Sequence, residues 1–389
     1  MKKIYIDVTS LTEVDFVTGI QRVVRNVILE MYKVIPQQLM LITYSMKRAA
    51  FLQLDIEQFV KYYSGEKTDK KKMFTTQKVE LEQLGQGDIF FDIDSVWNLP
   101  YKRSVLLPQL KAQGVKLAVY VYDIIPITHP QFCYEETTFL FMNYIGAYLL
   151  YADIVITSTR STLDEVFELK NKLGIDREIR GSFSWLGSDF VGEKKTNTGE
   201  VKDVVKLATK SPYILCVGTI EPRKNHVFLL DAFEKALYKK GINLVIAGKV
   251  GWNVEELMQR IQKSEYYNKQ LFRLTGLDDN EIEYLYQNAL ALAFPTYNEG
   301  FGLPMVEALE RGTPVLASDI PVLREVGGEY CEYFSLEDEK EFVQKVCNYI
   351  EHEDEYQKIK DRVSTFTSFT WEETAKRIID ALNEYENRS

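Results

Sequence analysis

Two glutamates separated by a glycine-bearing turn are the residues of this sequence best suited to chemistry. Glu299 and Glu307 stand eight positions apart in the stretch YNEGFGLPMVEAL, residues 297–309. Such carboxylates can form an acid/base pair, flank an anion-binding turn, or simply belong to a loop that enters a surface helix. Pro304 suits the first turn of a helix, where its missing N–H costs nothing, and Gly312 is placed to end that helix.

The turn before this expected helix is suited to close approach by a ligand. Gly300 and Gly302 permit unusual φ angles and close backbone contact. The apolar run LALAFP, residues 290–295, predicts a strand, so the turn lies at the carboxyl edge of a sheet, where open α/β folds bind ligands. Free N–H groups at the helix start suit a phosphate, and Glu299 and Glu307 would reach different parts of one ligand.

A second stretch with the same strand–turn–helix setting is GTIEPRKN, residues 218–225. Arg223 and Lys224 are adjacent cations there, Asn225 is a plausible helix cap, and Gly218 opens the turn. Two cations beside a helix N-terminus suit a diphosphate, especially one that gains charge as it leaves. A solvated basic loop is the alternative.

Composition sets the broad class of protein. A chain of 389 residues with 46% hydrophobic and 27% charged residues predicts two soluble globular domains. The net charge of −10 argues against a nucleic-acid partner. Four cysteines without CxxC spacing indicate reduced thiols.

Two segments bear on membrane contact. The basic run at residues 67–72 is a solvated loop or a contact to an anionic membrane surface. The apolar region at residues 139–156 contains Asn143 and Asp153, so it predicts a buried helix followed by a strand rather than a membrane span.

The order of elements predicts an α/β fold. In the first half, strands expected at residues 3–8, 39–44, 88–93, 115–123 and 153–158 alternate with helical patterns, which is typical of βαβ units around a parallel sheet. Residues 191 to about 212 are polar and predict a domain linker. In the second half, the expected elements are strands at 213–220, 243–248, 270–276, 290–295 and 314–319, a helix at 226–240 closed by Gly241, and a tail helix from 371.

The pairing of EPRKN with NEGFGLPMVEAL resembles the retaining glycosyltransferases of the GT-B fold, the large family four. Glu299 and Glu307 meet its signature of two glutamates separated by seven residues. The resemblance covers the second half of the chain. It extends to the first half through TGIQRVVRN (residues 18–26) and VYDIIPITHP (residues 121–130), and GKVGW (residues 248–252) also fits. These segments are similar to bacterial mannosyl- and rhamnosyl-type enzymes that build cell-surface polysaccharides.

The resemblance implies an architecture. Two Rossmann-like, doubly wound domains would face a cleft that holds the active site. Residues 1–195 would form the acceptor-side domain and residues 210–370 the nucleotide-sugar-binding domain. The helix at residues 371–389 would pack back on the N-terminal domain.

The family's roles are carried over by motif. Arg223 and Lys224 would hold the donor diphosphate, Glu299 would contact the donor sugar, and Glu307 would bind the ribose hydroxyls. The remaining donor-binding residues would be Gly218, Asn225 and the turn Gly300, Phe301, Gly302 and Leu303, whose amides would bind sugar hydroxyls and phosphate.

The first half supplies weaker candidates. Gly19 would open a helix facing the cleft, with Arg22 one turn in, as phosphate or acceptor contacts or as core-packing neighbours. Many relatives carry His-Asp where this chain has Tyr122-Asp123, so Asp123 is expected near acceptor or sugar, grouped with the catalytic residues. His129 and Lys249 are the other cleft candidates. For His129 the alternative is a simple turn residue.

The implied reaction is transfer of a hexose, of mannose or rhamnose type, from a nucleotide-diphosphate sugar to a saccharide or lipid-linked saccharide, with retention of configuration. No side chain is an obvious nucleophile, which favours front-face displacement, with the leaving phosphate taking the acceptor proton. No cofactor and no metal are expected. Asp92 and Asp94 form the sequence DxD, which is the metal-nucleotide motif of another glycosyltransferase fold. The alternative is a polar strand end without a function.

The expected location is the cytoplasm, with peripheral contact to the inner face of the cell membrane left open. Two rival functions remain at this stage. One is a nucleotide-sugar epimerase of the same fold, and the other is a non-catalytic partner subunit of a glycosyltransferase complex.

Overall fold

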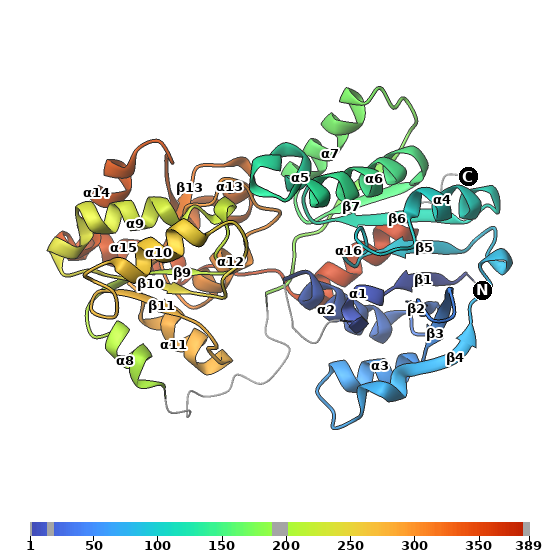
Figure 1. The fold of residues 1–389 in the computed structure, drawn as a ribbon, viewed down its shortest axis with the longest axis horizontal. Coiled ribbons are helices and arrows are strands. Elements are labelled where there is room, and N and C mark those ends of the chain that lie inside the picture. The colour runs from blue at the N-terminus through green and yellow to red at the C-terminus, as the bar shows by residue number, and fades with distance from the viewer. Residues whose placement is uncertain (1, 14–18, 189–200, 384–389) are drawn as a thin grey trace. The chain divides into compact units, whose positions relative to one another are not determined.

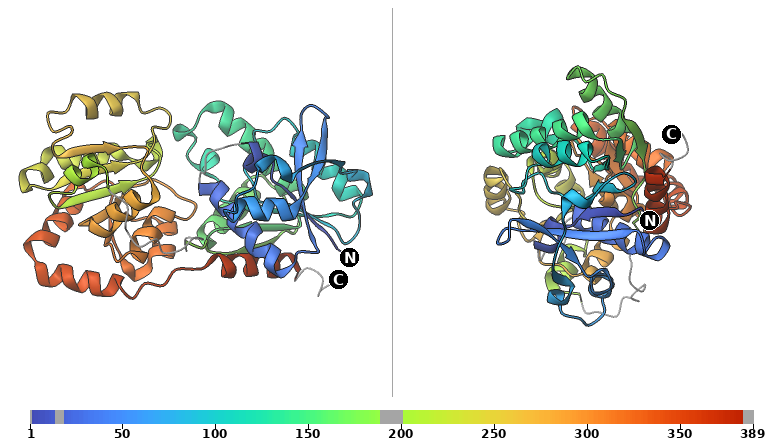
Figure 2. Two further views of the ribbon diagram at one scale, coloured as in Figure 1. Left: turned by 90° about the horizontal axis from the view of Figure 1, so that it is seen from below. Right: turned by 90° about the vertical axis from the view of Figure 1, so that its right-hand side faces the viewer.

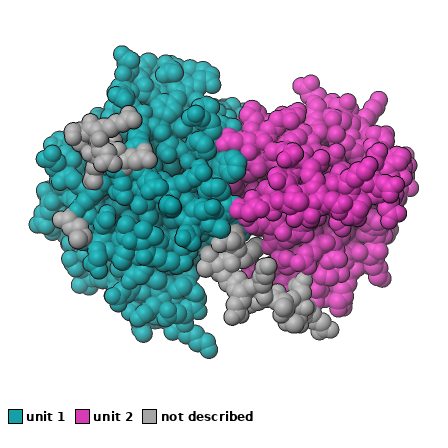
Figure 3. Space-filling model, turned by 180° about the vertical axis from the view of Figure 1, so that it is seen from behind, with its two compact units in different colours: residues 1–191, 369–389 teal, residues 192–368 magenta. Residues whose placement is uncertain are grey.

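The computed structural model describes residues 2–13, 19–188 and 201–383, which form two compact units. Unit 1 comprises residues 1–191 and 369–389, and unit 2 comprises residues 192–368 (Figure 3). The expected domain boundary at residue 195 and the chain end beyond residue 383 lie outside the described residues. Each unit is an α/β layer structure with helices on both faces of one twisted sheet (Figures 1 and 2).

Unit 1 contains an eight-stranded sheet of order β4-β3-β2-β1-β5-β6-β7-β8. Its strands are β1 (Ile4–Asp7), β2 (Leu39–Ser45), β3 (Ala50–Leu54), β4 (Phe74–Lys78), β5 (Ile89–Asp92), β6 (Lys116–Val121), β7 (Ile154–Thr157) and β8 (Arg180–Phe183). The expectation of a parallel sheet holds for six strands, but β3 and β4 pair antiparallel. A four-residue connection between β2 and β3 is too short for a parallel crossover, so the chain returns as a hairpin.

The helices of unit 1 cover that sheet. They are α1 (Thr9–Glu13), α2 (Gly19–Val34), α3 (Ile56–Tyr63), α4 (Arg103–Ala112), α5 (Ile125–Thr128), α6 (Glu135–Tyr151), α7 (Arg160–Lys172) and α16 (Trp371–Asn383), with 3₁₀ turns at η1 (Lys70–Met73), η2 (Leu81–Gln83) and η3 (Pro130–Phe132). The basic run falls on η1, where Lys71 and Lys72 are exposed.

Helix α6 differs from the buried helix that its apolar sequence predicts. One face packs in the core through residues such as Tyr148, which is fully buried. The other face leaves Phe139 67% exposed and Leu150 52% exposed. The hydrophobic residues of α6 therefore lie on an exposed face as well as on the buried one. None of the described helices is both long and apolar enough to cross a membrane.

Helix α16 belongs to unit 1, as the sequence predicted for the tail (Figure 2). Its Thr374 hydroxyl donates to the carbonyl of Trp185 at 2.8 Å, and Ser184 donates to the carbonyl of Thr374 at 3.3 Å. A Cβ at Gly187 would stand 2.4 Å from the backbone nitrogen of Trp371, so only glycine permits this approach.

A buried ion cluster lies beneath the carboxyl edge of this sheet. Arg103 donates to Asp92 at 2.5 and 2.9 Å and to Asp7 at 2.6 Å, and the side chains of all three are at most 1% exposed. The hydroxyl of Tyr148 also donates to Asp92. Burial raises the pKa of Asp92, and Arg103 counteracts part of that shift.

Asp92 and Asp94 are therefore not an exposed polar strand end, which was one interpretation of the DxD motif. Asp92 holds Arg103, while Asp94 accepts the backbone N–H groups of Leu11 and Ser95, both at 2.7 Å. Burial is the main cause that raises the pKa of Asp94 to about 7. Both carboxylates therefore serve the packing of unit 1.

Unit 2 contains a six-stranded parallel sheet of order β11-β10-β9-β12-β13-β14. Its strands are β9 (Tyr213–Val217), β10 (Asn243–Ala247), β11 (Leu271–Leu274), β12 (Ala291–Phe294), β13 (Val315–Ser318) and β14 (Cys331–Phe334). Every residue of β10, β12 and β13 is buried, which confirms the doubly covered sheet that the continuous apolar runs predict.

Helices flank both faces of this second sheet. They are α8 (Asp203–Ala208), α9 (His226–Lys235), α10 (Glu255–Lys263), α11 (Asp279–Asn288), α12 (Leu303–Glu310), α13 (Pro321–Gly327), α14 (Glu339–Glu351) and α15 (Glu353–Val363), with 3₁₀ turns at η4 (Pro222–Lys224), η5 (Leu237–Lys240) and η6 (Gly328–Tyr330). None of the four cysteines, all of which lie in the described part of the chain, forms a disulfide.

Two expectations for unit 2 were wrong. Part of the expected linker forms α8, because Val205 and Ala208 bury an apolar side that the polar composition of this stretch hides. The helix expected at residues 226–240 stops at Lys235, where Ala236 leaves helical geometry with φ −138°. The chain then continues as η5 and ends at Gly241 in the left-handed conformation, φ 72°.

We expect Asp92→Asn to destabilise unit 1 by about 3–5 kcal/mol, because it removes one partner of a buried charge. Denaturant unfolding of the full chain measures this. Asp164→Asn is the matched control, since Asp164 is exposed on α7. Unchanged stability of Asp92→Asn, combined with a loss of activity that manganese or magnesium restores, would contradict the structural role.

Candidate functional site

The candidate site lies at the carboxyl edge of the unit 2 sheet, at its topological switch point. From β9 the chain steps outward to β10 and β11, then returns to place β12 on the opposite side of β9. Ligands of doubly wound sheets bind at such a reversal. The loops that follow β9 and β12, residues 218–225 and 295–302, flank it and carry both sequence motifs.

The loop after β9 is fixed by the loop after β10. The backbone N–H of Ile220 donates to the carbonyl of Lys249, and that of Gly251 donates to the carbonyl of Ile220, both at 2.9 Å. A Cβ at Gly248 would stand 1.8 Å from the carbonyl oxygen of Gly218, so no other residue fits there. Gly218 itself adopts φ 137°. The stretch GKVGW contains Gly248, but its residue types alone do not reveal this steric requirement.

The two cations sit on the 3₁₀ turn η4, directly before α9. Asn225 occupies the cap position of α9 in the left-handed conformation, φ 53°. Its side chain makes no capping hydrogen bond, so the expected role as a side-chain cap was wrong. Asparagine tolerates this conformation better than most residues, and the reversal it makes directs the chain from η4 into α9. Next to it, His226 is neutral, because burial lowers its pKa to about 4.

Both cations bind the first glutamate of the sequence motif. Nη1 of Arg223 lies 2.7 Å from Oε1 of Glu299, and Nζ of Lys224 contacts the same oxygen. Burial by itself would raise the pKa of Glu299, but Arg223 and Lys224 outweigh it and lower the pKa below the ordinary value. Glu299 is therefore ionised. The roles carried over from the family place Arg223 and Lys224 on the donor diphosphate and Glu299 on the donor sugar. They do not reveal that these side chains pair with one another.

A second carboxylate completes the charge balance. Nη2 of Arg223 lies 2.6 Å from Oε1 of Glu221, and Nη1 donates to the carbonyl of Asn298 at 2.5 Å. Burial raises the pKa of Glu221, and Arg223 is the main group opposing that shift. Two cations thus face two carboxylates. The side chains of Arg223 and Lys224 remain 16% and 12% exposed, so an incoming anion can reach them.

Backbone contacts lock the two loops together. The N–H of Tyr297 donates to the carbonyl of Arg223 at 3.0 Å, and the hydroxyl of Thr296 lies 3.2 Å from the same oxygen. The hydroxyl of Ser318, at the end of β13, donates to the carbonyl of Thr296 at 2.6 Å. Neither Thr296 nor Ser318 carries a sequence signal that separates it from an ordinary loop residue.

The glycine turn leads into α12 as expected. Gly302 is the cap residue of α12 with φ 94°, whereas Gly300 is not among the glycines with positive φ. The expected need for unusual backbone geometry therefore holds for Gly302 alone. Leu303 begins α12 and Phe301 is buried at 6% exposure. Gly312 follows the helix in the left-handed conformation and its N–H donates to the carbonyl of Leu309.

Glu307 lies one turn into α12 and is held by a neighbouring helix. Its Oε2 accepts the hydroxyl of Tyr286 from α11 at 2.9 Å, and its backbone carbonyl accepts Nη1 of Arg311 at 2.6 Å. The guanidinium of Arg311 also lies over the ring of Tyr286, 5.2 Å from its centroid. Tyr286 is thus a positioning residue that the sequence did not reveal, because it lies 21 residues away on another helix.

Two candidates from the first half lie at the carboxyl end of β6 in unit 1. The hydroxyl of Tyr122 donates to the carbonyl of Ile93 at 2.7 Å, and Asp123 accepts the N–H of Ile125 at 3.0 Å. His129 is close to Thr128 and stacks on Phe132. Asp123 thus supports the turn after β6 and Tyr122 ties this turn to the end of β5, while the expected acceptor roles stay predictions.

Gly19 and Arg22 lie on α2 of the same unit. Gly19 is the first residue of α2, as expected, and Nη2 of Arg22 donates to the carbonyl of Ser188 at 3.2 Å. Thr18, which opens the sequence segment, lies outside the described residues. In unit 2, Lys249 is exposed on the loop after β10.

Comparison with known proteins agrees with this arrangement. Residues 197–366 match the family described as Glycosyl transferases group 1. The chain is 27% identical over 392 residues to the serotype-specific mannosyltransferase WbdA of Escherichia coli, across 98% of this chain and 45% of WbdA. It is 32% identical over 175 residues to the O-antigen chain mannosyltransferase RfbU of Salmonella typhimurium, across 44% of this chain and 46% of RfbU. The chain therefore spans about half the length of the curated relatives it matches.

A solved structure shows the same fold. The crystal structure of Anabaena HepE in complex with UDP and glucose superposes with a TM-score of 0.66 at 14% identity, covering 98% of this chain and 99% of HepE. The fold is thus that of the GT-B glycosyltransferases. The match of residues 197–366 to the Glycosyl transferases group 1 family agrees with the resemblance found in the two motifs.

We expect Glu299→Gln to bind a nucleoside diphosphate about tenfold more tightly than the unsubstituted chain. The neutral side chain no longer competes with the diphosphate for Arg223 and Lys224. Tenfold is ~1.4 kcal/mol, well within the ~4 kcal/mol between unit charges 4 Å apart at an effective dielectric constant of about 20. Calorimetry with GDP, UDP, ADP and dTDP measures the affinity.

Glu310→Gln is the matched control for this substitution. It makes the same change in net charge at an exposed position of α12. Weaker diphosphate binding by Glu299→Gln than by Glu310→Gln would show that Glu299 does not compete with the ligand.

Proposed function

We propose that the protein is a retaining hexosyltransferase that moves a mannose-type sugar from a nucleotide-diphosphate donor to a saccharide or lipid-linked saccharide of a surface polysaccharide. The observation that carries the proposal is the cluster of Arg223, Lys224 and Glu299 at the switch point of the unit 2 sheet. The sugar and the acceptor class follow from the similarity to WbdA and RfbU, both named mannosyltransferases.

In this proposal the donor diphosphate displaces Glu299 from the two cations. The phosphate oxygens accept charge-assisted hydrogen bonds from Arg223 and Lys224, and the released Glu299 carboxylate turns to the hydroxyls of the donor sugar. The N–H groups at the start of α12 add their positive end to the same region. Glu307, held by Tyr286, then meets the ribose of the nucleotide.

The chemical step needs stabilisation of a departing diphosphate more than a protein nucleophile. Arg223 is already held by Glu221 and Asn298, and Nζ of Lys224 lies over the ring of Phe294, so the two cations need little reorganisation when charge develops. The leaving phosphate oxygen takes the proton of the attacking acceptor hydroxyl on the same face, which gives retention. No cofactor enters this scheme. The acceptor is assigned to unit 1, and contact with a membrane surface is part of the proposal only if the acceptor is lipid-linked.

A nucleotide-sugar epimerase of the same fold is the second candidate. It would use the same donor contacts, but would release a changed sugar without an acceptor. The similarity to proteins named mannosyltransferases favours transfer. A non-catalytic partner subunit is less well supported, because all four charged groups of the cluster are present and paired, namely Glu221, Arg223, Lys224 and Glu299.

The proposal is tested by incubating the chain with GDP-, UDP- and dTDP-hexoses and mannose oligosaccharides. We expect one donor to give an elongated product, and proton NMR of the initial product should show the anomeric configuration of the donor. An inverted product would overturn the retaining mechanism. Conversion of the donor sugar without an elongated product would favour the epimerase.

We expect Lys224→Ala to lower the turnover number by roughly 10²–10³-fold, the scale for loss of one preorganised group that stabilises developing charge. Lys239→Ala is the matched control, since Lys239 is an exposed lysine of η5. Because the cations supply the charge in this mechanism, activity of the unsubstituted chain should persist in EDTA. Complete loss in EDTA, reversed by manganese or magnesium, would refute the metal-free mechanism.

A further inference from the structure

The outward side of α6 is apolar along most of its length. Phe139, Met142 and Leu150 are exposed there. Together with Gly146 they recur at spacings of three and four residues, which place all four on one face of the helix. We call residues 139, 142, 146 and 150 the α6 stripe. An extended apolar surface that stays exposed in a folded protein often marks an interaction site.

Gly146, near the middle of the α6 stripe, is not required by the packing of unit 1. It has ordinary helical geometry and is not among the glycines with positive φ. A Cβ at this position would meet no atom of the described chain within 4 Å. Glycine in the middle of a helix is destabilising relative to alanine. Because neither the backbone nor the internal packing needs it, the glycine indicates close approach by a group from outside unit 1.

The α6 stripe has the shape of a surface that fits a copy of itself. Large exposed side chains stand at its two ends, Phe139 and Leu150, and Gly146 adds no side chain between them. When two such helices lie antiparallel, Phe139 of one copy faces Leu150 of the other, and Met142 packs over Gly146. The same patch then serves both copies about a two-fold axis, which is what an isologous interface requires.

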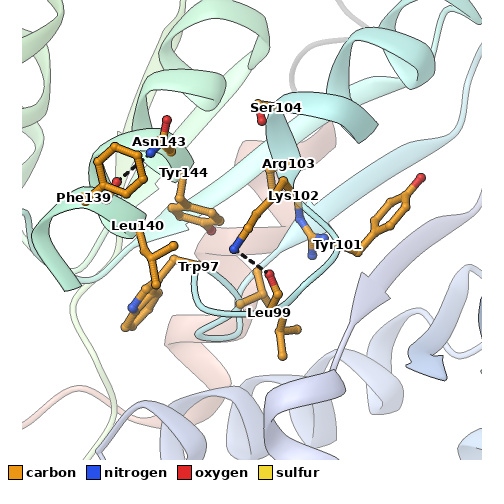
Figure 4. A pocket seen from close by; sticks show the side chains of 11 residues that line it. Trp97, Leu99, Tyr101, Lys102, Arg103, Ser104, Phe139, Leu140, Asn143 and Tyr144 are labelled. Atoms are coloured by element: carbon orange, nitrogen blue, oxygen red, sulfur yellow. Dashed lines mark hydrogen bonds between the residues drawn. The ribbon is translucent and has the colours of Figure 1, made fainter. Parts of the chain in front are cut away.

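The surface beside the first turns of α6 adds apolar contacts to the stripe. A cavity of about 240 Å³ lies between the loop after β5 and the first turns of α4 and α6, and Phe139 and Asn143 belong to its lining (Figure 4). The apolar side chains of Leu99 and Leu140 lie in the same lining. Leu150 of an antiparallel second copy would lie against Phe139 at the edge of this cavity, so the interface is wider than α6 alone.

The charges at the two ends of α6 are opposite in sign. Residues 135–136, at its start, are exposed glutamates, and the exposed Lys102 of α4 beside them offsets one of the two charges. Beyond the end of α6, Lys111 and Arg177 both pair with Asp153, which leaves one positive charge in excess. An antiparallel pair places the acidic start of each helix beside the basic end of the other, whereas a parallel pair would bring like charges together.

The same charges argue against an anionic membrane as the occupant of this face. Surfaces that bind anionic lipids carry clusters of Lys and Arg. Here a membrane that covered the α6 stripe would bring the glutamates at residues 135–136 against lipid phosphates. A second copy gives both ends of the helix a partner of opposite charge.

We propose that two copies of this chain form a two-fold symmetric dimer through the α6 stripe, with the two α6 helices antiparallel and crossing near Gly146. The inference goes beyond the proposed function and does not depend on the reaction. One helix face is small beside the roughly 800 Å² that each partner buries in a standard stable interface, so the dimer is a reversible one.

The test is sedimentation equilibrium of the full chain at concentrations from about 1 to 500 µM, a range that covers weak association. We expect the average mass to rise with concentration toward that of two chains. Leu150→Glu should weaken association at least about tenfold, because each copy brings a charge into the apolar contact. Val34→Glu is the matched control, since Val34 is an exposed apolar residue at the end of α2, a helix that packs against α16.

A second variant separates loss of the interface from a folding defect. Gly146→Gln places a polar side chain where the two helices cross, and should also weaken association at least about tenfold. Its free energy of unfolding in dilute solution should equal or exceed that of the unsubstituted chain, because glutamine favours a helix more than glycine does and the position has room for a side chain. Denaturant unfolding at about 1 µM chain, where the dimer is dissociated, measures this stability.

Three results would overturn the proposed dimer. The first is the mass of one chain at every concentration. The second is association of equal strength in Leu150→Glu, Gly146→Gln and the unsubstituted chain, which would place the interface elsewhere. The third is co-sedimentation with phosphatidylglycerol vesicles that Leu150→Glu abolishes, while the chain without vesicles stays monomeric, which would show that the α6 stripe binds a membrane instead.

Discussion

The paired charges of Glu299 with Arg223 and Lys224 are the interaction on which the candidate site depends. One carboxylate oxygen contacts both cations, in surroundings that leave the Glu299 side chain only 9% exposed. A buried cation without a counter-ion is costly, so the empty site needs this carboxylate. In the proposed function, the same pairing keeps the cations in one place before a diphosphate arrives. Stability of the empty site and readiness for the ligand thus come from the same contact.

Other parts of unit 2 hold Glu299 close to Arg223 and Lys224. The two loops come from strands that are neighbours in the sheet only because the strand order reverses at β9. Gly248 lets the loop after β10 press against Gly218, which fixes the path of the loop that carries Arg223. On the other side, Gly302 starts α12 in a conformation that few other residues adopt, and so sets the direction of Glu307. Each glycine acts through backbone geometry, although the chemistry belongs to the charged side chains.

Sequence patterns predicted most of the strands and the two motif loops, because hydrophobic periodicity and turn residues are local signals. They did not predict β3 and β4, because these five-residue strands are too short to give a clear periodic signal. They also missed Tyr286 and the pairing of Glu299 with the cations, which join residues 21 and 75 positions apart. Asn225 was misjudged because a cap and a left-handed turn favour the same residue type. The residues with suitable chemistry could therefore be predicted from the local sequence, whereas contacts that depend on how the elements pack could not.

Charged residues at a sheet edge can have a structural role or a ligand-binding role. The exposure of the charged side chains differs between the two units and separates these roles. In unit 1, the side chains of Arg103 and Asp92 are at most 1% exposed, and the hydroxyl of Tyr148 also donates to Asp92. Such a buried ion pair stabilises the packing of unit 1, so the DxD motif has a structural role there. In unit 2, Lys224 and Arg223 keep 12% and 16% of their side chains exposed. In the proposed mechanism, a phosphate oxygen enters through this small opening and replaces the carboxylate of Glu299, while the backbone contacts around it remain intact.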